Sequence, residues 1–210
     1  MKRTTPLTTE RTVVSAERGQ PARLSPQSLS ESERRIVAVW AADCAEHVLP
    51  LFEAEAPTDD RPRDAIARTR AFARGELGTA EQIRRRFVAG RAAHAVSGAA
   101  AVAAARAAAQ ASGVAHMGAH ALGAAAYAAK AAGAAAAAAG KDVADGRDAV
   151  DDEIRWQLAR ASAGTRIVLR RLPRLGEDRA GPLGAGLLSA GILGSTIRTI
   201  QAELAGDAVH

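Results

Sequence analysis

Four of the five histidines in this sequence stand at helical spacing from other polar residues that could act with them. Asp43 and His47 are four residues apart and lie within about 60° of Trp40 on a helical wheel, so we expect both on a buried stripe. His94 falls on the corresponding stripe of a later helix. A further set lies within about 80° of one another on the longest alanine-rich helix; this set is His116, His120, Tyr127 and Lys130. The spacing therefore predicts a polar cluster inside the fold.

Three interpretations of this cluster stay open. The favoured one is a hydrogen-bonded core network in which Asp43 accepts from one or two imidazoles, because buried polar groups must be paired. The second is a pocket where Lys130 and the histidines meet an anionic group of a ligand or partner. The third is a metal site, since two pairs with i,i+4 spacing on two helices can supply ligands from one face. Its ligands would be Asp43, His47, His116 and His120. We expect no cofactor.

Catalytic arrangements are weak elsewhere in the chain. There is no glycine-rich phosphate loop after a strand and no serine elbow. Cys44 and His47 are three residues apart on a helix, a placement that rarely aligns a nucleophile with its base, and Cys44 is more typical of a small buried apolar residue. Asp59 and Asp60 are better explained as a helix cap. We therefore predict that the protein is not an enzyme.

Alanine supplies most of the apolar residues of the 210-residue chain, and aromatic residues make up only 3 % of it. Alanine is the best helix former, and its methyl group lets helix axes approach closely. No segment alternates apolar and polar residues as a strand would. The composition therefore predicts an all-α fold, a single-domain, alanine-rich bundle of about six to eight helices.

Capping signals and apolar periodicity place these helices. Ser30 and Glu33 form a capping box, and Pro50 should make the helix that follows kink or restart near His47 before it ends at Pro57. A second helix should pass through residues 66–72 and end at Gly75. The others are expected from 79 to the break at 97–98, and over 99–111, 114–139, 142–161, 165–172 and 183–204.

The domain organisation follows from the same pattern. Residues 1–29 have the Thr-, Ser-, Arg- and Pro-rich composition of a disordered tail. Residues 30–174 form the helical domain. Residues 175–210 add a glycine-rich loop and an apolar C-terminal helix, which either docks on the bundle or meets a partner.

Charge and cysteine content limit the cellular setting. One cysteine excludes a disulfide-stapled secreted domain, so a cytoplasmic protein is expected, and the longest alanine tract is too weakly apolar to span a membrane. The net charge is +5, and seven arginines between residues 155 and 179 face only Glu177 and Asp178. Nucleic acid or an acidic partner could use that excess, but no aromatic residues alternate with the arginines, which does not favour nucleic-acid binding.

Two segments carry a resemblance to a known family: WAADCAEHVLPLFE at 40–53, followed by DDRPR at 59–63, and AHMGAHALGAAAYAAK at 115–130. They resemble the actinobacterial immunity proteins of the immunity-protein-five-like group, over roughly residues 34–156. The spacing also fits the helix end FARGE at 72–76.

The resemblance implies an all-helical cytoplasmic protein that binds a cognate toxin and blocks it. The leading hypothesis is thus a non-enzymatic helical binding protein with a toxin as its partner. The alternative is a metal- or small-molecule-binding helical protein that uses the interior Asp/His cluster. Inhibitors of basic nucleases tend to present acidic surfaces, whereas this chain is mildly basic, so the toxin need not be a nuclease.

Overall fold

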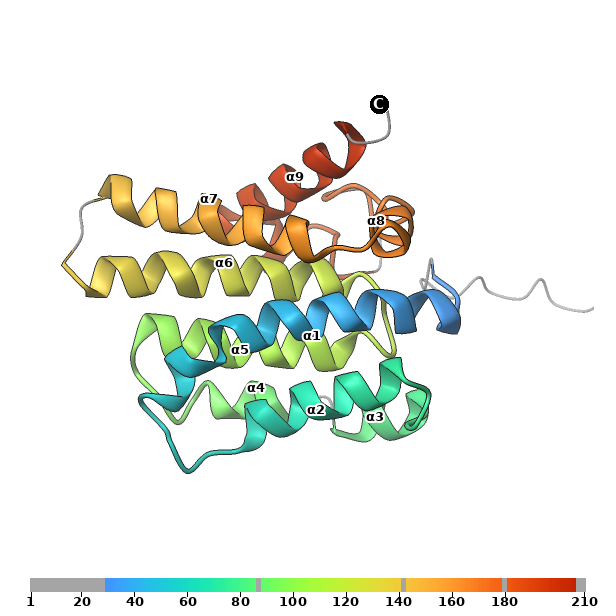
Figure 1. Cartoon of the computed structure of the whole chain (residues 1–210), viewed down its shortest axis with the longest axis horizontal. Coiled ribbons are helices and arrows are strands. Elements are labelled where there is room, and N and C mark those ends of the chain that lie inside the picture. Colours follow the sequence, from blue (N-terminus) through green and yellow to red (C-terminus); the bar gives the residue numbers. More distant parts are fainter. Residues whose placement is uncertain (1–28, 86–87, 141–142, 179–180, 207–210) are drawn as a thin grey trace, which may run out of the picture.

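The computed structural model describes residues 29–85, 88–140, 143–178 and 181–206, and every regular element in these ranges is helical (Figure 1). The all-α prediction is therefore confirmed. The tail predicted before residue 29 lies outside the described ranges. The elements are α1 (Glu31–Glu53), α2 (Arg61–Ala73), α3 (Thr79–Arg85), α4 (Val88–Ala92), α5 (Ala99–Gly113), α6 (His120–Ala138), α7 (Val143–Arg160), α8 (Ala163–Leu169), the 3-10 turn η1 (Leu187–Ser189) and α9 (Gly191–Gly206).

Helix α6 is the centre of the bundle. It packs against α1, α5, α7 and α9, and Figure 1 shows it between α7 and α5. Every residue from 121 to 129 is buried, because neighbouring helices cover this stretch on all sides. Only small side chains can fill such a position when the axes approach closely, and alanine and glycine supply nearly all of them.

Larger side chains close the outer layers. Trp40 and Phe52 on α1 and Phe72 on α2 are fully buried. Helix α9 buries Leu193, Ile197, Ile200 and Leu204, residues that recur every three or four positions, and it packs on α6. Of the two roles expected for the C-terminal helix, the structure therefore shows docking on the bundle.

Several helix ends agree with the sequence signals. The Ser30 side chain accepts from the amide of Glu33 at 3.3 Å, and the Glu33 carboxylate accepts from the amide of Ser30 at 2.8 Å, which is the predicted capping box. Gly75 ends α2 with a φ of +85°, a value that glycine adopts without strain. Helix α1 continues through Pro50 and ends at Glu53, before the predicted stop at Pro57.

Three predicted helices are shorter than expected. In the segment after Thr79 the described helical residues are those of α3 and α4 and end at Ala92, and the C-terminal segment is helical only at η1 and from Gly191 onward. Residues 114–119 form turns, because the amides of Val114 and His116 bond three residues back, to Ala111 and Gly113. His116 therefore precedes α6, and its predicted place on one helical stripe with Tyr127 is wrong.

Helices α6 and α7 approach each other closely at two glycines. A Cβ atom placed on Gly133 would lie 2.7 Å from Cγ2 of Val150 and 3.2 Å from the carbonyl oxygen of Gly146. Such distances leave no room for a methyl group, so Gly133 sets the spacing of the two helices.

We predict that Gly133→Ala lowers the free energy of unfolding by about 1–2 kcal/mol. Overpacking costs about 1–3 kcal/mol, and the better helix propensity of alanine offsets about 1 kcal/mol of it. Urea denaturation measures the difference. Gly164→Ala on α8 is the control, because its Cβ would meet only the Ser162 hydroxyl oxygen, at 3.8 Å, and its stability should be unchanged or slightly raised. Equal losses for the two variants would contradict the close approach.

Candidate functional site

A chain of hydrogen bonds runs from α6 through α7 to the surface at α1. The fully buried Gln157 donates from Nε2 to the carbonyl oxygen of Ala125 at 3.1 Å and to Oε1 of Glu153 at 2.8 Å. Glu153 is only 4 % exposed, and its Oε2 lies 2.7 Å from Nδ1 of His47. A buried carboxylate needs such partners, so the core fixes the position of a surface histidine.

The ring of His47 lies flat on Trp156, with 3.7 Å between the ring centroids and 6° between the planes. The guanidinium carbon of Arg160 is 5.2 Å from the centroid of the same indole. The indole of the neighbouring Trp40 donates to the carbonyl oxygen of Gln157 at 2.8 Å and ties α7 to α1. His47, Trp156 and Arg160 are thus held in one arrangement where α1 and α7 meet the solvent.

The exposed stripe of α1 continues from this stack toward the start of the helix. Ile36 and Val39 are 39 % and 46 % exposed and share a helical face with His47, since Val39 follows Ile36 by three residues and precedes His47 by eight. We call the surface formed by Ile36, Val39, His47, Trp156 and Arg160 the α1/α7 face. It combines exposed aliphatic groups with an ordered aromatic and cationic stack.

Salt bridges to α2 border the same stripe. One guanidinium nitrogen of Arg70 lies 2.8 Å from Asp43 and also contacts Glu46. Asp43 is therefore paired with Arg70 and not with the histidine expected for it. His47 contacts Glu153 instead. The arginine of α2 reaches Asp43 because α2 packs directly along α1.

The expectation that His47 and His94 point inward is wrong. The side chain of His47 is 41 % exposed, because its hydrogen bond to Glu153 and its stacking on Trp156 hold it at the rim of the α1–α7 contact. His94 is exposed in the turn after α4. That turn follows from the early end of α4 at Ala92.

His116 and His120 form a separate pair at the junction of α5 and α6. Their ring centroids are 5.0 Å apart, and Nδ1 of His120 lies 2.7 Å from Oε1 of Gln110, to which it donates. The ring of His120 packs on Gly113, where a Cβ would come within 2.9 Å. Burial, with a smaller effect from the neighbouring His116, lowers the pKa of His120 from 6.5 to about 4.

The remaining predicted residues have other neighbours. Tyr127 is 2 % exposed, and the guanidinium carbon of Arg106 lies 5.9 Å from its ring centroid. Lys130 is half-buried further along α6. The expected cluster is thus divided among the α1/α7 contact, the α5–α6 junction and single sites. Within the described ranges, no group of three or more His, Cys, Asp or Glu residues is placed to hold a metal ion.

The sequence did not single out Glu153 or Trp156, and it marked Arg160 only as one of the seven arginines between residues 155 and 179. A signal for one of them was present: Glu153 and Gln157 are four apart and lie within about 60° of Val150 on the wheel, taking about 100° per residue. Like Asp43, these two polar residues share a helical face with apolar residues, which predicts a buried position for them. The stack on Trp156 had no such signal, because it depends on the packing of α1 against α7.

The comparison with protein families agrees with this architecture. Residues 27–163, more than half of the chain, match the family described as Imm-5 like putative immunity protein, and the chain belongs to this family. The α1/α7 face and the histidine pair both lie in the matched part. No curated protein and no solved structure gave a significant match. In the part of the chain that the structure describes, no helix is long and apolar enough to cross a membrane.

We predict that Cys44 is unreactive in the native protein. Its side chain is fully buried, and burial raises the pKa of the thiol well above its usual value, with further contributions from the negative charges of Glu153 and Asp43. A chromogenic disulfide reagent at pH 8 should label the thiol only in denaturant. Rapid stoichiometric labelling of the folded chain would contradict the burial.

His120 should make stability depend on pH. Its folded pKa is depressed, so between pH 6.5 and about 4 the unfolded chain binds a proton that the native state does not. Stability is therefore highest above pH 6.5 and falls as the pH decreases, by about 3 kcal/mol at most from this group.

Urea denaturation of the wild type and of His120→Gln at several pH values between 4 and 7 tests this. The glutamine variant keeps a donor for Gln110 and should lose less stability across the range than the wild type does. His94→Gln is the matched control, since His94 is exposed. Parallel pH profiles for the wild type and His120→Gln would refute the effect.

Proposed function

We propose that this chain binds a cognate toxin in the cytoplasm and neutralises it without catalysis, and that the α1/α7 face is the surface that the toxin contacts. The proposal rests on family membership together with one structural observation: the anchored stack of His47, Trp156 and Arg160. This stack lies at the surface in the family-matched part of the chain.

The composition of the face suits protein binding. Tryptophan and arginine are the residues most often found at the centres of binding interfaces, where a few side chains account for most of the affinity. Ile36 and Val39 add aliphatic area beside them, and the Arg70 salt bridges with Asp43 and Glu46 form a charged border. An apolar and aromatic centre with a polar rim is the usual arrangement of a protein interface.

Pre-organisation adds to this argument. Ordering a long side chain on binding costs about 0.5–1.5 kcal/mol. Here the hydrogen bond from His47 to the buried Glu153 and the stack on Trp156 order the side chains before a partner arrives. The free protein therefore already holds the face in a binding geometry.

The charge of the chain limits which kind of toxin surface can complement it. The net charge of the chain is +5, and the face presents Arg160, while the bordering Asp43 and Glu46 share Arg70 as their ion-pair partner. A toxin surface with carboxylates near an apolar patch complements this face better than the basic surface of a nuclease does.

Co-expression with toxins encoded by adjacent genes tests the proposed function. We expect one of them to form a complex with this chain and to lose its toxicity. Val39→Asp and Arg160→Glu should each weaken that complex at least about 10-fold, which corresponds to about 1.4 kcal/mol, as measured by calorimetry. Both side chains are exposed, so the variants should fold.

Leu187→Asp is the matched control, because Leu187 is a 66 % exposed aliphatic residue on η1, away from the proposed face. It should protect against the toxin as the wild type does. If no neighbouring toxin binds, the immunity role is wrong. If a toxin binds equally well to all three variants, the role stands and the α1/α7 face is the wrong surface.

A further inference from the structure

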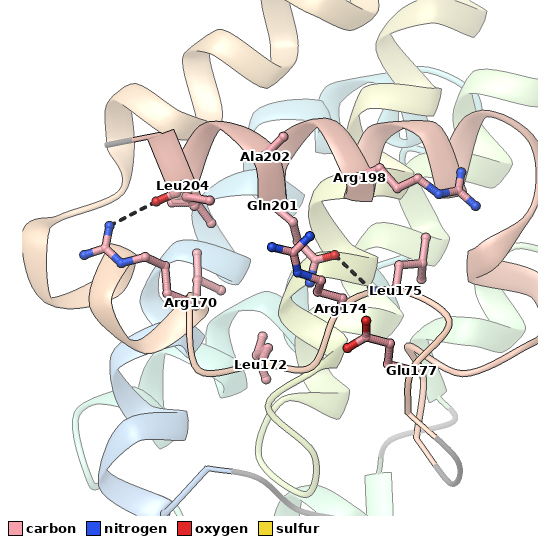
Figure 2. Close-up of a pocket in the computed structure, with 11 residues that line it drawn as sticks. Arg170, Leu172, Arg174, Leu175, Glu177, Arg198, Gln201, Ala202 and Leu204 are labelled. Carbon is pink, nitrogen blue, oxygen red and sulfur yellow. Dashed lines mark hydrogen bonds between the residues drawn. The ribbon is translucent and has the colours of Figure 1, made fainter. Parts of the chain in front are cut away.

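A second surface lies outside the family-matched part of the chain. The segment after α8 and one side of α9 enclose a groove of about 570 Å³ (Figure 2). Its first lining residue is Leu169, and the family match ends at residue 163. The groove thus lies outside the family-matched residues, and the toxin-binding proposal does not use it.

The walls of the groove are fixed by one glutamine. Gln201 of α9 donates from Nε2 to the carbonyl oxygen of Pro173 at 2.9 Å and accepts from the amide of Leu175 at 3.0 Å. Both polar ends of its side chain are used on the backbone of the facing segment. The groove is therefore a formed feature of the fold, and its width is set by these two hydrogen bonds.

The lining of the groove is aliphatic with cationic groups. Leu169, Leu172 and Leu204 are buried and form its apolar lining. Arg170, Arg174 and Arg198 also line it, and all three are exposed. Figure 2 shows the three guanidinium groups spread along α9.

These arginines have unused donors. Arg170 donates to the carbonyl oxygen of Leu204 at 3.2 Å, and Arg198 donates to that of Ser189 at 3.2 Å, whereas a guanidinium carries five N–H donors. Within the described part of the chain, none of the three forms an ion pair with a carboxylate. Glu177 is the one acidic residue among the lining residues. The groove therefore presents a net positive charge to solvent.

The geometry points to an extended acidic peptide as the occupant. We infer that the groove binds a segment of a partner protein in which carboxylates alternate with aliphatic side chains. Arg170 contacts the carbonyl oxygen of Leu204, which lies six residues after Arg198 on α9. Six helical residues rise about 9 Å, so the two arginines are separated along α9 by the length of about three extended residues. Carboxylates on such a peptide would meet the arginines bidentately, and its aliphatic side chains would cover the leucines.

Other occupants fit less well. A nucleic-acid strand would need aromatic side chains for its bases to stack on, and all lining residues are aliphatic or polar. The chain's own residues 1–28 carry five basic and two acidic side chains, so their net charge has the same sign as that of the groove and does not favour binding there. Charge and lining together favour an acidic segment of another protein.

A peptide-binding measurement tests the inference on the full-length chain. The probe is a fluorescein-labelled hexapeptide of alternating aspartate and leucine, and its amide counterpart of alternating asparagine and leucine is the negative probe. We expect fluorescence anisotropy to show saturable binding of the acidic peptide, at least 10-fold tighter than the amide peptide, and weaker binding at high salt. The double variant Arg174→Gln and Arg198→Gln should weaken binding at least 10-fold.

The matched control is the double variant Arg84→Gln and Arg91→Gln, which removes the same charge from exposed positions on α3 and α4. It should bind as the wild type does, and circular dichroism should show all variants folded. Equal loss in both double variants, or equal binding of the two peptides, would overturn the inference. Tighter binding of a single-stranded oligonucleotide than of the acidic peptide would do the same. No toxin enters this measurement, so its failure leaves the proposed function unaffected.

Discussion

The close approach of helices with almost no side-chain volume between them is the constraint on which the structure depends. Residues 121–129 of α6 are buried on every side, and at Gly133 the side chain of Val150 and the backbone of α7 together leave no room for a methyl group. Dispersion contacts between backbones replace those that larger side chains would make. A bundle built in this way tolerates little change of spacing, because few flexible side chains lie between the close helices to adjust to it.

That constraint decides where recognition can occur. Residues 121–129 of α6 have no free surface, so residues that contact a partner at this level of the bundle must come from the surrounding helices. Gln157 provides an anchor for one of them, since it reaches the carbonyl oxygen of Ala125 on α6 and orients Glu153, which in turn holds His47 at the surface. Small residues on α6 make this possible, because they leave the carbonyl oxygen of Ala125 within reach of a side chain on α7.

The fold was predictable from the sequence to the extent that local signals determine it. The Ser30 capping box, the stop at Gly75 and the helical character of the alanine tracts depend on backbone preferences that are visible in the chain. The polar sites were only partly predictable. A helical wheel shows which residues share a face, but which face is covered depends on the neighbouring helix, so His47 was expected inside and lies at the rim. His116 was misplaced because alanine favours the helix so uniformly that the turn at 114–119 has no strong local signal.

The two surfaces differ in how their positions are determined. The α1/α7 face depends on a long-range contact, because residues 47 and 156 meet only when the whole bundle has formed. The groove beside α9 depends on contacts within the last third of the chain, where Gln201 joins Pro173 and Leu175. Helix α9 nevertheless packs on α6, so the same alanine-rich core supports both. The groove can therefore vary in sequence without disturbing Glu153 or the stack that it anchors, as long as the buried leucines and isoleucines of α9 continue to cover α6.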